Sequence, residues 1–305
     1  MACLKPLTIQ NPKYRESKPW IEPWLIVPCG KCPACLIDKR KELATRILME
    51  SECSINNYFF TLTYDDIHVP MRNYGEEESP CYHYCFDKKA VQKFIKRVRK
   101  RLFGNVRGSL RYIVTSEYGH ASLRPHYHCI FFNVPSFYSS REFARILQES
   151  WSFGIVGGFG ILQDGGSHYV AKYCFKDGFA DVPFLEKTWY LASRRPPLGF
   201  PWLASKSKLI EFLKENETDK FKGWKNSLVK IPRIFANKIF DDELLRLVRD
   251  KQRTDYDKAQ EVRFASLVLK HGNAYGAIEE LRGELAQRRI LLNQSINRSL
   301  KKNKL

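Results

Sequence analysis

Arg124-Pro125-His126-Tyr127-His128-Cys129-Ile130-Phe131-Phe132 is the stretch that decides both the fold and the chemistry of this 305-residue chain. Successive side chains of a strand point to opposite faces, so His126 and His128 share one face. The opposite face then carries Tyr127, Cys129 and Phe131. Two imidazoles side by side on a rigid strand provide half of a metal site. The stretch therefore predicts a strand with one core face and one ligand face.

A carboxylate that could complete the ligand set is Glu117, at the end of a predicted strand over residues 110–117. If this strand pairs antiparallel with residues 126–133, Glu117 lies next to both histidines. Two neutral imidazoles and a carboxylate can hold Mg²⁺ or Mn²⁺ and leave positions open for phosphate oxygens. Imidazole favours Mn²⁺, whereas Mg²⁺ is far commoner in cells. His120 and His168 are further candidates, although His120 falls in an expected loop, and structural histidines are the alternative interpretation.

A second motif, Tyr169-Val170-Ala171-Lys172-Tyr173, follows some forty residues later. Ser167 can cap a helix through Tyr173 to Lys176, in which Tyr169 and Tyr173 stack about 6 Å apart on one side. A tyrosine with a pKa near 10 is a poor nucleophile until a metal or a lysine lowers the cost of its charge. Lys172, about 100° around the helix, could assist the phosphate or the leaving oxygen. A metal beside two phenols indicates phosphodiester cleavage by a covalent tyrosine; core aromatic residues are the alternative.

The order of predicted elements indicates an α+β fold with an antiparallel sheet. Residues 57–64 form a strand whose alternate residues Phe60, Leu62 and Tyr64 share a face. A basic helix after the capping residue Asp87, two strands (110–117 and 126–133), a helix (140–151) and a glycine-rich strand (154–162) follow. This is the order of a ferredoxin-like or RNA-recognition-type sheet. One face of such a sheet stays partly open, as a platform for a single strand of nucleic acid.

Four segments are expected along the chain. Residues 1–56 form a cysteine-rich arm and a first helix (36–54), and residues 57–177 form the core. Residues 178–240 lack clear periodicity, contain Ser193-Arg194-Arg195-Pro196-Pro197, and are expected to wrap around the core. Residues 241–305 have helical periodicity and end in a basic tail that is expected to fray.

The net charge of +18 points to a polyanionic partner. Ten Lys and Arg residues and no acidic residue occur between Lys88 and Ser116. A solvated helix face would explain a short run of this kind, but its length favours binding to a phosphate backbone. No apolar run approaches the roughly 20 residues that cross a bilayer, and the N-terminus lacks the apolar core of a signal peptide. We therefore expect a nucleic-acid partner, no membrane partner and a cytoplasmic location.

The odd count of nine cysteines argues against a disulfide framework. Cys29, Cys32 and Cys35 form two successive C-x-x-C steps, which bring three thiolates together. Cys3 is the preferred fourth ligand, ahead of Cys53, Cys81 and Cys85. Zinc is the usual metal of such a closed structural site. Free thiols and an iron–sulfur cluster are the alternatives, although the run lacks the ferredoxin pattern.

HYH followed by YVAKY resembles the HUH endonucleases, the tyrosine nucleases that start rolling-circle replication. More narrowly, PCGKCPAC, FFTLTYDD, SEYG followed by RPHYH, YVAKYCFK and SRRPPLGFPW, in this order, resemble the replication initiators of microviruses of the gokushovirus group. The resemblance covers residues from about 28 to 235, and no motif of the family maps onto the helical region after residue 241. It implies that His126, His128 and Glu117 bind the catalytic metal.

The resemblance also implies a reaction. Tyr169 or Tyr173 would attack the origin phosphate, leaving a 5′-phosphotyrosine and a free 3′-OH for the host polymerase. The other tyrosine would cleave the regenerated origin, and strand transfer would reseal a circle. No G-x-x-x-x-G-K-[ST] motif is present, so unwinding would require a host helicase.

Two other readings stay open from the sequence. A transposase or plasmid relaxase of the same superfamily would use similar motifs, but transposases of this type usually have one tyrosine nucleophile. A non-catalytic nucleic-acid-binding protein with a zinc knuckle would explain the charge and the cysteines. It would not explain why Glu117, HYH and the paired tyrosines occur together.

Overall fold

The computed structural model describes residues 3–12, 14, 23–104, 110–119, 121–162, 170, 171, 174 and 184–301. These residues divide into two compact units. One contains Arg40–Leu213 and Lys220–Phe235; the other contains Met1–Lys39, Lys214–Asp219 and Ala236–Leu305. Helix α1 (Pro33–Glu52) begins in the second unit and ends in the first. The fold of each unit is described separately.

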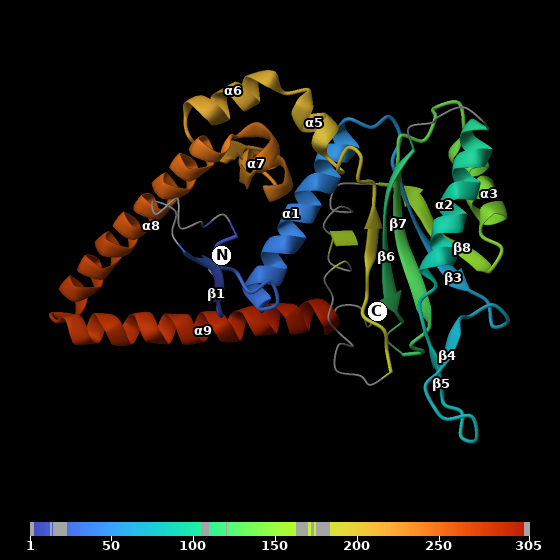
Figure 1. The fold of residues 1–305 in the computed structure, drawn as a ribbon, viewed down its shortest axis with the longest axis horizontal. Helices are drawn as coiled ribbons and strands as arrows, with labels where there is room; N and C mark the ends of the chain where they lie inside the picture. Colours follow the sequence, from blue (N-terminus) through green and yellow to red (C-terminus); the bar gives the residue numbers. More distant parts are fainter. Residues whose placement is uncertain are drawn as a thin grey trace. The chain divides into compact units, whose positions relative to one another are not determined.

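The first unit is built on a five-stranded antiparallel sheet with the order β8-β3-β7-β6-β9 (Figure 1). Its strands are β3 (Tyr58–Tyr64), β6 (Arg111–Tyr118), β7 (Pro125–Phe132), β8 (Gly154–Ile161) and β9 (Tyr190–Ala192). Without β9, the strands lie across the sheet in the chain order fourth, first, third, second. Two helices, α2 (Lys88–Phe103) and α3 (Ser140–Ser150), connect them, which is the split βαβ arrangement of ferredoxin-like sheets. The predicted α+β class with an antiparallel sheet is confirmed.

The register of β7 fixes which residues share a face. Glu117 pairs with His126, and Thr115 pairs with His128. On the other side of β7, Thr63 pairs with His126 and Thr61 with His128. Directly paired residues point to the same face. The antiparallel pairing expected of residues 110–117 and 126–133 is thus confirmed.

One face of the sheet carries the larger apolar core. Helices α2 and α3 cover it (Figure 1). Its fully buried side chains include Phe60, Phe94, Tyr127, Phe131 and Trp151. The side chain of Asp87 accepts a hydrogen bond from the Ala90 amide at 2.9 Å, so α2 begins with the predicted cap. The apolar stripe of α2 packs on this core, and its basic side chains therefore point away from the sheet.

The opposite face is half covered. Near its Phe132 end, Ile113, Ile130 and Phe132 pack with Leu43, Ala44 and Ile47 of α1 and with Val170, Ala171 and Cys174. Near its His126 end the face carries the polar residues Thr61, Thr63, Thr115, Glu117, His126 and His128. Polar and covered halves thus meet on a single sheet face.

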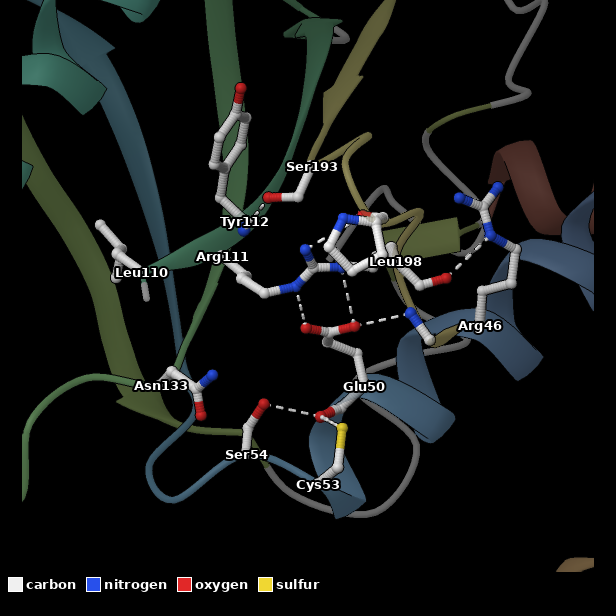
Figure 2. A network of polar contacts seen from close by, with 12 residues as sticks. Arg46, Glu50, Cys53, Ser54, Leu110, Arg111, Tyr112, Asn133, Ser193 and Leu198 are labelled. Atoms are coloured by element: carbon white, nitrogen blue, oxygen red, sulfur yellow. Dashed lines mark hydrogen bonds and ion pairs between the residues drawn. The ribbon is translucent and has the colours of Figure 1, made fainter. Parts of the chain in front are cut away.

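A buried ion pair connects α1, β6 and the segment after β9 (Figure 2). Glu50 is 1% exposed and accepts two hydrogen bonds from Arg111, one of them at 3.2 Å. It also accepts the Gly199 amide at 2.6 Å, while Arg111 donates to the Pro196 carbonyl at 3.0 Å. These contacts fix the backbone of residues 196–199.

The first unit contains several short elements where the sequence predicts only loops or an extension. They are β4 (Met71–Asn73), β5 (Tyr82–Tyr84), α5 (Phe200–Ala204), β10 (Lys220–Lys222), η1 (Trp224–Asn226) and β11 (Leu228–Lys230). Two further helices, α6 (Ser207–Glu215) and α7 (Arg233–Ile239), cross the boundary between the units. The short strands pair as hairpins, β4 with β5 and β10 with β11. Three-residue strands are too short to show periodicity, which is why the sequence did not reveal them.

The second unit contains a two-stranded sheet and two long helices. The sheet pairs β1 (Leu7–Gln10) with β2 (Trp24–Val27), so part of the expected irregular arm is a hairpin. Helices α8 (Asp242–His271) and α9 (Ala274–Lys301) carry ion pairs between Arg263 and Glu284 and between Lys270 and Glu280. The helical character expected after residue 241 is confirmed. No helix of the described residues is long and apolar enough to span a membrane.

Candidate functional site

The candidate active site lies at the polar half of the sheet face and is built from adjacent strands. Pro125 begins β7, and alternation then directs His126 and His128 to the face opposite Tyr127. Glu117 lies on β6 directly opposite His126. Its carboxylate Oε2 lies 2.6 Å from Nε2 of His128. The strands thus place the three residues expected from the sequence as cross-strand neighbours.

Thr61 is a partner of His128 that the sequence motifs do not indicate. Its Oγ1 lies 3.3 Å from Nδ1 of His128, and the Phe59 ring stacks on the imidazole at 6.2 Å between centroids. A hydroxyl can donate or accept, so it serves either tautomer of the ring. When Nε2 binds a metal, Nδ1 carries the proton and donates it to Thr61. The alternation of FFTLTY placed Thr61 on this face, but only the register shows that it meets His128.

His126 is held differently. Its Nδ1 is buried and has no hydrogen-bond partner among the described residues. Its Nε2 lies against Gly119, where an added Cβ would come within 2.9 Å of it. Burial and the neighbouring His128 lower the pKa of His126, so the ring offers a neutral nitrogen lone pair at pH 7. An unpaired buried nitrogen costs about 1–3 kcal/mol, which a bound ion would offset.

Glu117 and the two histidines fit a divalent ion in part. Two ligands at right angles and about 2.1 Å from an octahedral ion lie about 3 Å apart, close to the observed 2.6 Å between Glu117 and His128. His126 does not complete a compact three-ligand group with them; among the described residues only the cysteines form such a group. The donor types fit Mg²⁺ or Mn²⁺, and His126 would have to turn toward the other two.

The expected nucleophiles Tyr169 and Tyr173, together with Lys172 and the histidines His120 and His168, lie outside the described residues. Their chain neighbours are described. Val170 and Ala171 are buried in the core of the site face. The thiol of Cys174 shares a hydrogen bond with Thr115, the residue paired with His128, while burial raises the pKa of this thiol to about 12. The YVAKYC motif is therefore anchored on the sheet face that carries the candidate ligands.

Other phenols near these strands are not suited to nucleophilic attack. Tyr64 and Tyr127 share a hydrogen bond of 3.2 Å in the opposite core, and Tyr127 accepts the Asp87 amide at 2.9 Å. Burial raises the pKa of both phenols. They stay protonated and face away from Glu117.

A second candidate site is the cysteine group of the other unit. The sulfur atoms of Cys3, Cys29, Cys32 and Cys35 lie within 4.8 Å of one another. The Cys3 and Cys32 sulfurs are 3.8 Å apart, and tetrahedral zinc with Zn–S bonds of about 2.3 Å places its sulfurs about 3.8 Å apart. The four cysteines named from the sequence gather in one place, and the group could bind a metal such as zinc.

The electrostatics of the group favour bound thiolates. Backbone amides of Cys29 and Cys32 donate to the sulfurs of Cys3 and Cys29, both at 3.3 Å. Burial raises the pKa of Cys32, but hydrogen bonds from the Cys35 and Leu4 backbones outweigh it and bring it to about 6. Burial and the neighbouring sulfurs raise the pKa of Cys35 to about 12. A positive ion would relieve the repulsion that prevents full deprotonation.

Comparison with known proteins places these features in a family context. Residues 57–178 match a family of phage replication-associated proteins described by its ORF2 members. The Replication-associated protein ORF2 of Spiroplasma virus 4 is 27% identical over 302 residues, which cover 88% of each chain. The chain resembles microvirus replication-associated proteins. The predicted resemblance is thereby confirmed.

Two further relatives match over part of their length. The Replication-associated protein VP4 of Bdellovibrio phage phiMH2K is 30% identical over 163 residues, 49% of this chain and 48% of its own. The Replication-associated protein ORF4 of Chlamydia phage 1 is 29% identical over 164 residues, 49% of this chain and 38% of its own. No solved structure matches the chain significantly. The segment matched by the family contains Glu117, His126 and His128 and both expected tyrosines.

Proposed function

We propose that the chain is an HUH-type replication initiation endonuclease. It nicks single-stranded origin DNA through a 5′-phosphotyrosine and rejoins it by strand transfer, in rolling-circle replication of a small single-stranded DNA phage in the host cytoplasm. The observation that carries the proposal is the cross-strand group of Glu117, His126 and His128 on the sheet face where residues 170, 171 and 174 are anchored. The printed names of the relatives support the assignment to replication.

Glu117, His126 and His128 would hold Mg²⁺ or Mn²⁺, which supplies Lewis-acid polarisation of the scissile phosphate when bound. Thr61 would orient His128 through Nδ1, and the buried Nδ1 of His126 supports a site that gains a partner when it is loaded. The chain's own contribution is to place these donors on a rigid sheet, where the surrounding packing fixes their positions.

The tyrosines would carry the covalent step. The phenol oxygen of Tyr173 or Tyr169 forms a bond to phosphorus, the bond from phosphorus to the 3′ oxygen breaks, and that oxygen leaves with a proton as a 3′-OH. Lys172 would stabilise the phosphate or the leaving oxygen. In the second step a 3′-OH attacks the phosphotyrosine, and the phenol is regenerated. The number of phosphodiester-type bonds is conserved, so the reaction needs no ATP, and host helicase and polymerase would supply unwinding and synthesis.

The cysteine group would bind a structural zinc ion. Four sulfurs leave no ligand position open for substrate, which is the arrangement of structural rather than catalytic zinc. The ion would hold Cys3 to the start of α1 and stabilise the cluster that includes Leu292 of α9.

A covalent-adduct assay tests the proposal. The protein is mixed with single-stranded DNA of its own genome and Mn²⁺ and is separated on a denaturing gel. We expect a protein–DNA band that disappears in Tyr169→Phe with Tyr173→Phe and in His126→Ala, and that persists in Tyr256→Phe, a control in an exposed tyrosine of α8. DNA binding without any adduct, in any divalent metal, would favour the non-catalytic binding protein. An adduct retained by the double tyrosine variant would refute the nucleophile assignment.

A further inference from the structure

One motif of the sequence, Ser193-Arg194-Arg195-Pro196-Pro197, has no task in the proposed reaction. In the structure this segment follows β9, the edge strand beside β6. A pocket of about 330 Å³ opens there, lined by Arg46, Tyr190, Ser193, Arg194, Pro197 and Ile234 together with Ala192. Two cations and a phenol line a single pocket, which gives it the chemistry of an anion site.

The two arginines are available to a ligand. Arg46 is half-buried and uses Nε to donate to the Leu198 carbonyl at 3.1 Å. Its two terminal nitrogens make no contact in Figure 2 and have no hydrogen-bond partner among the described residues. Arg194 is exposed, and the described part of the chain gives it no ion-pair partner. Glu42, one helical turn before Arg46, forms no ion pair with it within the described residues.

An unpaired guanidinium that has lost part of its hydration is unfavourable. Burial lowers the pKa of Arg46, although arginine stays charged at neutral pH. Burial raises the pKa of Tyr190, while Arg46 and Arg194 both act to lower it, so the phenol lies within the field of both cations. The guanidinium of Arg46 is held by the same segment that Glu50 and Arg111 fix, and it is therefore positioned before any ligand binds.

The register connects this pocket to the candidate active site. Tyr190 pairs with Thr115, and Thr115 pairs with His128. Tyr190 and His128 therefore share a sheet face and are separated by two strand spacings, about 10 Å. A single DNA strand whose scissile phosphate lies at the histidines would bring another of its phosphates to the arginines. The basic side chains of α2 project from the other side of the sheet and do not supply this contact.

We propose that Arg46 and Arg194, with Tyr190, bind a non-scissile phosphate of the DNA strand and so fix its direction across the sheet. The inference rests on the proposed function, because it takes single-stranded DNA as the ligand. Arginine offers paired donors that match phosphate oxygens, and a pocket with two of them selects a phosphodiester over a base. The SRRPP segment thus acts in substrate positioning rather than in the chemical step.

The test is the salt dependence of binding to a single-stranded oligonucleotide, measured by fluorescence anisotropy without divalent metal. Loss of one phosphate contact should make the slope of log K against log salt shallower by about 0.7. We expect this for Arg194→Gln and Arg46→Gln. The matched control is Arg195→Gln, which removes the same charge from the next residue, outside the pocket lining. Because Arg194 is exposed, its variant should fold even if the Arg46 variant does not.

Equal slopes for Arg194→Gln and Arg195→Gln would overturn the inference, since the effect would then be one of general charge. Inorganic phosphate, at constant ionic strength, should compete with DNA better in the wild type than in Arg194→Gln. If phosphate binds the pocket while the DNA slope of Arg194→Gln is unchanged, the ligand is a small anion and the assignment to DNA is wrong. Failure of the proposed nuclease function shows separately, as the absence of an adduct in the wild type with the slope difference retained.

Discussion

Replacement of Glu50 by alanine should destabilise the sheet-containing unit more than any surface ion-pair variant. The carboxylate is 1% exposed, and the side chain of its partner Arg111 is 12% exposed. Removing it leaves a buried guanidinium without its counter-charge and the Gly199 amide without an acceptor. Breaking such a buried pair costs about 3–5 kcal/mol. With an m-value of about 2 kcal/mol/M, the urea midpoint should fall by roughly 2 M.

The matched control is Glu149→Ala, which breaks a pair with Arg101 whose side chains are 47% and 44% exposed. Exposed pairs contribute about 0–1 kcal/mol, so this variant should stay close to the wild type. Urea unfolding followed by hydrogen exchange of peptides from β6 and β7 reports on the unit that holds Glu50. Similar losses for the two variants would refute the reasoning. Glu50→Leu with Arg111→Met should be less destabilised than Glu50→Leu alone, because no unpaired charge stays buried.

Three further outcomes follow from the described contacts. Elemental analysis should find about one zinc ion per chain, lost in Cys32→Ser and kept in Cys53→Ser, whose thiol is exposed and outside the group; equal zinc in both variants would contradict the site. Thr61→Val removes the partner of His128 Nδ1 and should weaken Mn²⁺ binding by about 10–100-fold in a titration, with an unchanged urea midpoint of the metal-free protein. Phe94→Ala should lower the free energy of unfolding by about 3–5 kcal/mol, since the ring is fully buried, and a loss below about 1 kcal/mol would show that the core around α2 is loosely packed.

The parts of the fold that the sequence predicted are those with local signals. The strand over residues 58–64, the helix after Asp87 and the β6–β7 pair each carry a hydrophobic period or a cap within a few residues. Glu117 could be assigned because a short connection between two strands leaves antiparallel pairing as the simple arrangement. Cys3 could be named because a C-x-x-C run with three thiolates needs one more ligand.

The parts that the sequence did not predict depend on contacts between distant residues. Strand β9 is only three residues long and exists because it pairs with the middle of β6. Arg46 donates to Leu198, which is 152 positions away, so the pocket between them has no local pattern. Thr61 meets His128 because of the register between β3 and β7, which alternation alone does not fix.

The shared alternation of β7 links the gene's tolerance of length changes to folding. One residue inserted between His126 and His128 would send the two imidazoles to opposite faces. It would also turn Cys129 and Phe131, which are fully buried, toward solvent. Variants of this kind would be lost as misfolded protein before selection could act on their activity. Insertions and deletions that persist in such genomes should therefore fall in the turn between Gly119 and Arg124, where a change in length leaves the phase of both strands intact.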